Sequence, residues 1–307
     1  MAIAKRYSTF SDELKRVFGC KVQRISIDAG LTCPNLDGTL DTRGCIYCGG
    51  HGSGSYGIRR ELAITGQLHD GMEVMRRKYK ASAFLAYFQS YSNTYAPVEL
   101  LRRMYGEALA VPAVVGMISA TRPDCLADDV MDYLEELNGR TYFWLELGMQ
   151  SMHDKSLELI NRRHDHACLV DAVRRAKARG LRICVHVILG LPGESRPETL
   201  AMTGELNRLQ VDGVKLHLLH VMRGTVLADM HARGEVDVMD RDGYAGLVCD
   251  FLELLDPRIL IHRLTGDGGR DNLIAPLWSL KKFEILNLID AELERRGTCQ
   301  GSRFNPL

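Results

Sequence analysis

Apolar and β-branched residues recur along the chain in short runs that are separated by longer amphipathic segments. The runs cover residues 22–28, 83–88, 113–119, 142–148, 182–190, 213–221 and 258–264. Most of the intervals between them place apolar residues at helical spacing, as in 97–110, 126–139 and 167–180. Strands that alternate with helices of this length are typical of βαβ units and predict a parallel sheet.

The predicted helices carry ordinary boundary signals. Pro97 lies near the start of one helix, Asn138 and Gly139 end the next, and a third has a basic last turn closed by Gly180. A final helix is expected over 277–297, followed by a short polar end. Six or seven strand–helix units fit a full or partial β/α barrel better than one doubly wound sheet. Such a barrel carries its active site at the C-terminal ends of its strands.

Composition and charge indicate the class of protein to which this α/β fold belongs and its expected location. The chain has 307 residues, of which 46% are hydrophobic and 25% charged, as in soluble globular proteins. Its 39 basic and 39 acidic residues balance, which lowers the expectation of strong non-specific nucleic-acid binding. The N-terminal segment lacks the apolar stretch of a secretory signal, and no apolar run is long enough to cross a bilayer. We therefore expect a cytoplasmic protein with no membrane partner.

The nine cysteines argue for metal or redox chemistry rather than a disulfide framework, because the chain shows no export signal. Cys33, Cys45 and Cys48 follow the first predicted strand in one glycine-rich loop. They could bind zinc, with His51 completing a Cys3His site. They could equally hold a 4Fe–4S cluster through three thiolates and leave one iron open to an exchangeable ligand. The spacing alone favours neither, and a CxxC redox motif is a weaker third alternative.

Motifs in the rest of the chain carry a family resemblance. The aromatic Tyr47 directly precedes the last cysteine of the loop, and the sequences "GMQS", "INRRH" and "ILGLPGE" follow on successive elements. This ordered set resembles the radical SAM (S-adenosylmethionine) superfamily. The long spacing between the first two cysteines is similar to the branch that contains the catalytic subunit of elongator, which modifies the wobble uridine of tRNA.

A closer resemblance is to the YhcC/YtqA-type subfamily, and it extends over residues 21–300. The segments that carry it are "AYFQSYSNTYAPVE", "TRPDCL", "LELGMQSMHDKSLELINRRHD", "GVKLHLLHVMRGT", "IHRLTGD" and "IAPLWSLKK". The resemblance implies a partial (β/α)6-type radical SAM barrel, an incomplete relative of the TIM barrel, with a core over residues 17–257. A C-terminal extension, residues 258–307, would add short strand and helix elements that pack on this core.

The resemblance also implies the cofactors. Cys33, Cys45 and Cys48 would ligate three irons of a 4Fe–4S cluster, and the amine and carboxylate of SAM would chelate the fourth. An electron from a donor such as flavodoxin or ferredoxin would cleave SAM to methionine and a 5′-deoxyadenosyl radical, while the protein binds, orients and excludes solvent. The resemblance assigns no catalytic side chain.

The first half of the chain supplies five of the side chains that the resemblance places near SAM. Tyr47 would pack on or near the adenine. Gln89, Ser90 and Tyr91 follow the second predicted strand, where many relatives carry glycines, and would lie near the amino group of SAM. Thr121 follows the third predicted strand and would face the cavity.

The fourth and fifth strands supply the others. Gln150 and Ser151 follow the fourth strand, and Gln150 resembles a residue that hydrogen-bonds the SAM ribose. Arg162 resembles the residue that pairs with the methionine carboxylate, a group that a guanidinium can hold through two hydrogen bonds. Arg163 could share or replace this role. His186 would lie near the ribose or adenine, although a lone histidine on a strand is often a core residue.

The target is less defined than the cofactors. Polar residues at the ends of the later strands are expected to face the open mouth of the barrel and contact the substrate: Lys215, His217, His220, His262, Arg263 and Asp267. The resemblance to the elongator-like branch makes tRNA the expected substrate. A radical SAM enzyme with a non-RNA substrate, or a non-catalytic barrel stabilised by zinc or iron–sulfur, is the alternative.

Overall fold

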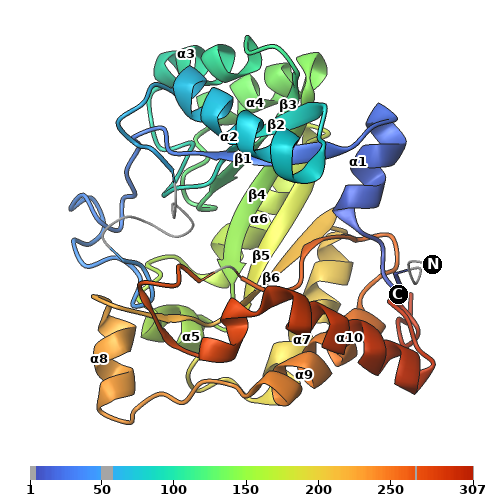
Figure 1. Cartoon of the computed structure of the whole chain (residues 1–307). Helices are drawn as coiled ribbons and strands as arrows, with labels where there is room; N and C mark the ends of the chain where they lie inside the picture. The colour runs from blue at the N-terminus through green and yellow to red at the C-terminus, as the bar shows by residue number, and fades with distance from the viewer. Residues whose placement is uncertain (1–4, 50–57, 267, 307) are drawn as a thin grey trace.

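The computed structural model describes residues 5–49, 58–266 and 268–306 and contains a seven-stranded parallel sheet. The strand order follows the chain except at the end, where β8 pairs with β6. The sheet curls into a half-barrel that stays open between β1 and β8 (Figure 1). Its strands are β1 (Val22–Ile27), β2 (Ala83–Phe88), β3 (Val114–Thr121), β4 (Tyr142–Gln150), β5 (Ile183–Leu189), β6 (Gly213–Leu218) and β8 (Leu260–Arg263).

Both faces of the sheet are covered, which explains why its strands are nearly continuous apolar runs. All six residues of β2 are buried. Phe84, Ala86 and Phe88 belong to the large core beneath the helices, whereas Leu85 and Tyr87 belong to a smaller core inside the half-barrel. This alternation is the two-residue period of a strand between two packed layers.

The helices cover the outside of the half-barrel (Figure 1). Those that connect the main strands are α2 (Ile64–Tyr79), α3 (Val98–Leu109), α4 (Asp128–Arg140), α5 (Asp154–Leu159), α6 (His166–Ala178), α7 (Arg196–Leu209), α8 (Val226–Ala232) and α9 (Arg241–Leu254). The start of α7 has a complete capping box, in which Ser195 and Glu198 each bind the other's backbone N–H. The predicted partial barrel is therefore confirmed.

The N-terminal helix α1 (Phe10–Phe18) packs beside the two unpaired edges, β1 and β8. Thr9 forms a parallel bridge to Ile261 on β8. Phe10 reaches into the half-barrel and stacks on His262, with ring centroids 3.9 Å apart. The helix thus fills the gap that the open sheet leaves near the N-terminal ends of its strands.

The C-terminal segment differs from the single helix expected over 277–297. A short antiparallel sheet of β7 (Val221–Met222) and β9 (Leu273–Ala275) precedes the 3-10 turn η1 (Leu277–Leu280). The helix α10 (Lys282–Arg296) begins after Lys281, whose non-helical backbone (φ −99°, ψ 59°) breaks the pattern, and it packs on α9. The division at residues 257 and 258 stays a prediction, and the strand β8 of the main sheet lies on its C-terminal side.

Candidate active site

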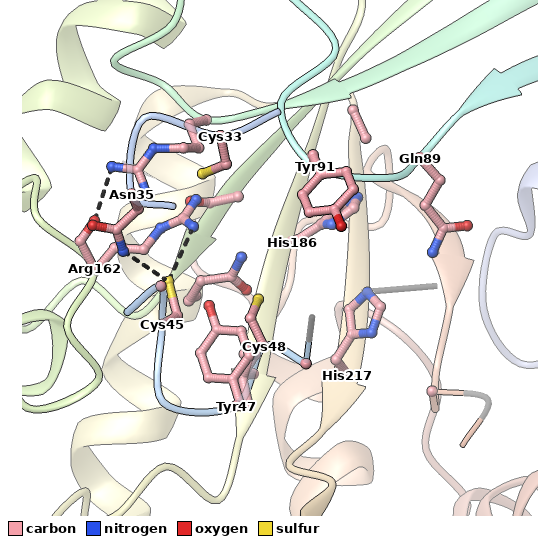
Figure 2. Close-up of a pocket in the computed structure, with 18 of the residues that line it drawn as sticks. Cys33, Asn35, Cys45, Tyr47, Cys48, Gln89, Tyr91, Arg162, His186 and His217 are labelled. Atoms are coloured by element: carbon pink, nitrogen blue, oxygen red, sulfur yellow. Dashed lines mark hydrogen bonds between the residues drawn. The ribbon is translucent and has the colours of Figure 1, made fainter. Parts of the chain in front are cut away.

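A cavity opens at the C-terminal ends of the strands and encloses about 1340 Å³, part of it open to solvent. Its lining comes from the loop after β1 and from the ends of β2 to β6 and β8. Cys33, Cys45 and Cys48 lie on one side of it, and Gln89 and His217 lie on the other (Figure 2).

The cysteine loop is folded by its own backbone hydrogen bonds and is tied to the segment after α5. Leu36 N–H donates to the carbonyl of Cys33 at 2.8 Å, and Cys48 N–H donates to that of Cys45 at 2.9 Å. The side chain of Asn161 donates to the carbonyl of Gly44 at 2.8 Å. Gly44 has a φ of +69°, and a Cβ there would lie 2.8 Å from Cδ2 of Leu36, so this turn requires glycine.

Positive charge and hydrogen-bond donors surround the Cys45 sulfur. Asn35 Nδ2 lies 3.6 Å and Arg162 Nη1 lies 3.7 Å from Sγ (Figure 2). The hydrogen bond with Cys48 and the charges of Arg162 and Arg122 lower the pKa of the Cys45 thiol well below its usual value, against the opposing effect of burial. The same hydrogen bond and burial raise the pKa of the Cys48 thiol, so Cys45 is the thiol of this pair that favours the metal-binding thiolate form.

The spacing of the three sulfurs does not match a closed zinc site. Among the described residues, one group of three metal-ligating side chains has its ligand atoms within 4.8 Å of one another, and it consists of Glu146, Cys184 and His186. The sulfur atoms of Cys33, Cys45 and Cys48 therefore do not all lie within 4.8 Å of one another. A tetrahedral zinc–thiolate site, with zinc–sulfur bonds of about 2.3 Å, would hold its sulfurs about 3.8 Å apart. His51, the suggested fourth zinc ligand, lies outside the described residues.

Arg162 is buried between the cysteine loop and β4. Its Nη2 donates to the carbonyl of Gly148 at 2.9 Å, and its Nε has no hydrogen-bond partner among the described residues. A Cβ at Gly148 would lie 2.7 Å from Nη2, so the guanidinium needs this glycine. Arg163 instead points to the exterior and pairs with Asp41 at 2.8 Å. Of the two arginines, Arg162 is the one that lines the cavity.

Most of the residues expected to contact SAM meet at this cavity. The lining includes Tyr47, Gln89, Tyr91, Thr121, Gln150, Arg162 and His186. Ser90 and Ser151 are buried and are not part of it. The hydroxyl of Ser151 bonds to the Glu194 carboxylate and accepts from the backbone N–H of His153, so Ser151 supports the turn after β4.

The residues expected at the substrate end divide into two groups. His217, His220 and Arg263 line the cavity as expected. Lys215 and His262 do not, because both are buried inside the half-barrel and bond to Glu146. The inward face of β6 carries both Lys215 and His217, but only the residue nearer the strand end reaches the cavity. Asp267 lies outside the described residues.

Several lining residues escaped the sequence analysis. Asn35 looks like an ordinary loop residue, and Ile188 looks like a core residue of β5. Glu146 was also missed, although a carboxylate in the middle of the apolar run of β4 was a visible signal. A charged residue in a buried strand requires a partner, which here comes from β6.

Family comparisons agree with this geometry. Residues 42–204 match the family model described as the radical SAM superfamily, and residues 211–295 match a radical SAM C-terminal domain. The chain belongs to the radical SAM superfamily. A radical SAM protein is expected to use SAM and a 4Fe–4S cluster, and the three-thiol loop beside a large cavity fits that pair.

Individual relatives place this radical SAM protein within the superfamily. It is 44% identical to the uncharacterised protein YtqA of Bacillus subtilis over 99% of this chain and 94% of that protein. It is 36% identical to protein YhcC of Escherichia coli over 98% of this chain and 96% of that protein. The resemblance to the YhcC/YtqA-type subfamily is therefore confirmed.

More distant relatives extend the comparison to the elongator-like branch. The tRNA uridine(34) acetyltransferase of Dehalococcoides mccartyi is 30% identical over 157 residues, which are 50% of this radical SAM chain and 33% of that protein. The solved structure of Elp3 from Methanocaldococcus infernus with an N-terminal deletion has a TM-score of 0.69 at 16% identity. The alignment covers 91% of this chain and 64% of that one, and it shows a shared fold. No helix in the described residues has the length and apolar character needed to span a membrane.

Proposed function

We propose that this radical SAM enzyme holds a 4Fe–4S cluster with Cys33, Cys45 and Cys48 and binds SAM in the adjoining cavity. The observation that carries the proposal is the convergence of three thiols and a buried, incompletely bonded Arg162 on one end of that cavity. Three thiolates leave one iron of such a cluster for an exchangeable ligand. When bound, the cluster and SAM supply a 5′-deoxyadenosyl radical by reductive cleavage, with electrons from a donor such as flavodoxin or ferredoxin.

The chain's own residues bind and orient SAM. Arg162 offers a guanidinium whose Nε lacks a partner, which suits a carboxylate such as that of the methionine moiety. Tyr47, half-buried next to the thiols, offers an aromatic face to the adenine. Gln150 and His186 on neighbouring strands offer hydrogen bonds to the ribose.

We further propose that the substrate is a wobble uridine of tRNA. The support is the similarity to the tRNA uridine(34) acetyltransferase of Dehalococcoides mccartyi, and this similarity extends over half of the chain. The base would be extruded into the mouth of the cavity and held at its edge by hydrogen bonds, since it cannot be reached inside a stacked loop. His217, His220 and Arg263 lie at the end of the cavity formed by β6 and β8 and are the candidates for those contacts.

A nucleoside profile of a deletion strain tests the substrate. Bulk tRNA, digested and analysed by mass spectrometry, should lack one modified wobble uridine or accumulate its precursor. Purified protein should bind that tRNA less tightly as salt rises, because phosphate contacts release counterions. An unaltered profile together with salt-insensitive or undetectable tRNA binding would contradict the tRNA proposal and point to a non-RNA substrate.

A further inference from the structure

A carboxylate lies buried inside the half-barrel, below the cavity. Glu146 on β4 has no exposed surface, and its Oε2 atom is contacted by Tyr87 Oη at 2.7 Å, His186 Nε2 at 2.7 Å and Lys215 Nζ at 2.9 Å. Lys215 also donates to the hydroxyl of Tyr87. His262 Nδ1 lies 3.3 Å from the other carboxylate oxygen. Four strands therefore supply partners to one carboxylate.

Glu146 and Lys215 form a buried ion pair. Burial raises the pKa of Glu146, but the Lys215 charge and the hydrogen bonds from His186 and His262 lower it well below its usual range. Burial lowers the pKa of Lys215 to about 8, and the Glu146 charge opposes that shift. Both groups are consequently charged at neutral pH.

His186 connects this network to the cavity. It lines the cavity with 14% of its side chain exposed, and its Nε2 is held by Glu146. An ionised carboxylate oxygen accepts hydrogen bonds and donates none, so Nε2 must carry a proton. Burial and the Lys215 charge lower the pKa of His186 to about 4, so the ring is neutral at pH 7 and Nδ1 keeps its lone pair. The Nδ1 atom of His186 makes no hydrogen bond to another described residue.

We propose that Glu146, held in place by Lys215 and Tyr87, fixes His186 as a neutral hydrogen-bond acceptor for a donor group of a nucleoside bound in the cavity. A ribose hydroxyl or the imide N–H of a pyrimidine would donate to Nδ1, whereas an anionic oxygen would be repelled by its lone pair. Glu146, Lys215 and Tyr87 are positioning residues, because they act through His186. The donor can belong to SAM or to the substrate. The inference rests on the proposed function in one respect, namely that this cavity is the reaction site.

His217 lies next to His186 in the cavity lining and is also a neutral side chain. Its ring centroid is 5.2 Å from that of His186, and burial together with His186, Arg263 and Lys215 lowers its pKa well below the usual value. Its Nε2 is buried without a hydrogen-bond partner among the described residues. Arg263 lines the cavity nearby, and its charge disfavours protonation of either ring. The charges of Lys215 on β6 and Arg263 on β8 thus disfavour protonation of His186 and, together with burial, outweigh the opposing effect of Glu146 on β4.

NMR of the purified protein, labelled with 15N at histidine, tests the tautomer without any substrate. Long-range proton–nitrogen correlations should show His186 protonated at Nε2, unprotonated at Nδ1, and neutral from pH 7 down to about pH 5. The His186→Phe variant identifies its signals, and the exposed His69→Phe variant serves as the matched control. A double variant, Glu146→Gln with Lys215→Met, removes both buried charges together and should yield a mixture of tautomers. An Nδ1–H tautomer or a charged ring at pH 7 in the unmodified protein would overturn the proposal.

Binding measurements identify the source of the donor. If the donor is the SAM ribose, His186→Phe should weaken anaerobic SAM binding by roughly two- to tenfold, the value of one neutral hydrogen bond. If the donor belongs to the substrate, SAM affinity should be unchanged and binding of tRNA from a deletion strain should weaken by a similar factor. Unchanged affinity for both probes, with the expected tautomer, would contradict the binding role of His186. The tautomer result holds whether or not tRNA is the substrate, so the two proposals can fail separately.

Discussion

At the residue scale, the cavity brings together three thiols from one loop, and a buried ion pair lies beneath it. Cys33, Cys45 and Cys48 share a loop, so their common role was visible in the sequence. Glu146 and Lys215 are 69 residues apart, and their pairing depends on strands that curl around a common interior. A strand period of two places Lys215 inside the barrel but does not say how deep it lies.

Arg162 should contribute to SAM binding more than its neighbour in sequence. We expect Arg162→Ala to weaken SAM binding roughly ten- to a hundredfold, because one charge-assisted contact to a carboxylate is worth about 1.5–3 kcal/mol. The control is Arg163→Ala, which removes an exposed arginine paired with Asp41 and should leave the affinity unchanged. Anaerobic calorimetric titration measures both, and an unaffected Arg162→Ala variant would assign the carboxylate to another cation.

The buried histidines should make the fold sensitive to mild acid. The pKa of His262, like that of His186, is lowered to about 4, mainly by burial. Between pH 4 and 6.5 the unfolded chain therefore binds more protons than the folded one, and the free energy of unfolding falls as pH falls. Each histidine contributes at most about 1.4 kcal/mol per pH unit in this window.

Urea unfolding at pH 7 and pH 5 measures this dependence. His262→Phe should reduce the difference between the two free energies of unfolding, since it removes one titrating group from the interior. The exposed His69→Phe variant should leave the difference as it is. Equal free energies at the two pH values in the unmodified protein would contradict the buried neutral histidines.

At the element scale, strands and long helices were predicted well, whereas the short C-terminal elements were expected only in general and their positions were not predicted. The range 83–88 matches β2 at both ends. β4 was expected to end at Gly148 but continues to Gln150, after a register shift relative to β5 and with a φ of +67° at Gln150. Such an irregularity changes the direction of side chains at a strand end and is hardly visible in the pattern of apolar residues. The three-residue β9 was missed because a strand that short shows no periodicity.

The turn of the cysteine loop should depend on Gly44. We expect Gly44→Ala to lower the iron content of anaerobically purified protein with little loss of helix signal, because the new Cβ would clash with Leu36 and the left-handed backbone costs about 1–2 kcal/mol. Gly38→Ala is the matched control, since its φ is also positive but the nearest atom lies 3.9 Å away. Equal iron retention in the two variants would show that the contact with Leu36 is unimportant.

At the scale of the whole molecule, the alternation of strands and helices was enough to predict a partial barrel. It did not predict that α1 fills the gap between β1 and β8, because no sequence motif indicates this packing. The cavity collects side chains from six strand ends and one loop, and seven of the nine residues expected to contact SAM lie in its lining. Ser90 and Ser151 are buried and do not line the cavity, although each directly follows a residue that does, and the order of residues does not contain this distinction.

Cys33, Cys45 and Cys48 should together hold an iron–sulfur cluster, and metal analysis of anaerobically purified protein can detect it. We expect a brown protein with about four irons and matching sulfide per chain. Cys33→Ala, Cys45→Ala and Cys48→Ala should each lose the cluster, and replacement of the distant Cys299 by serine should retain it. A colourless protein with one equivalent of zinc, or a full cluster in Cys33→Ala, would contradict this ligand assignment.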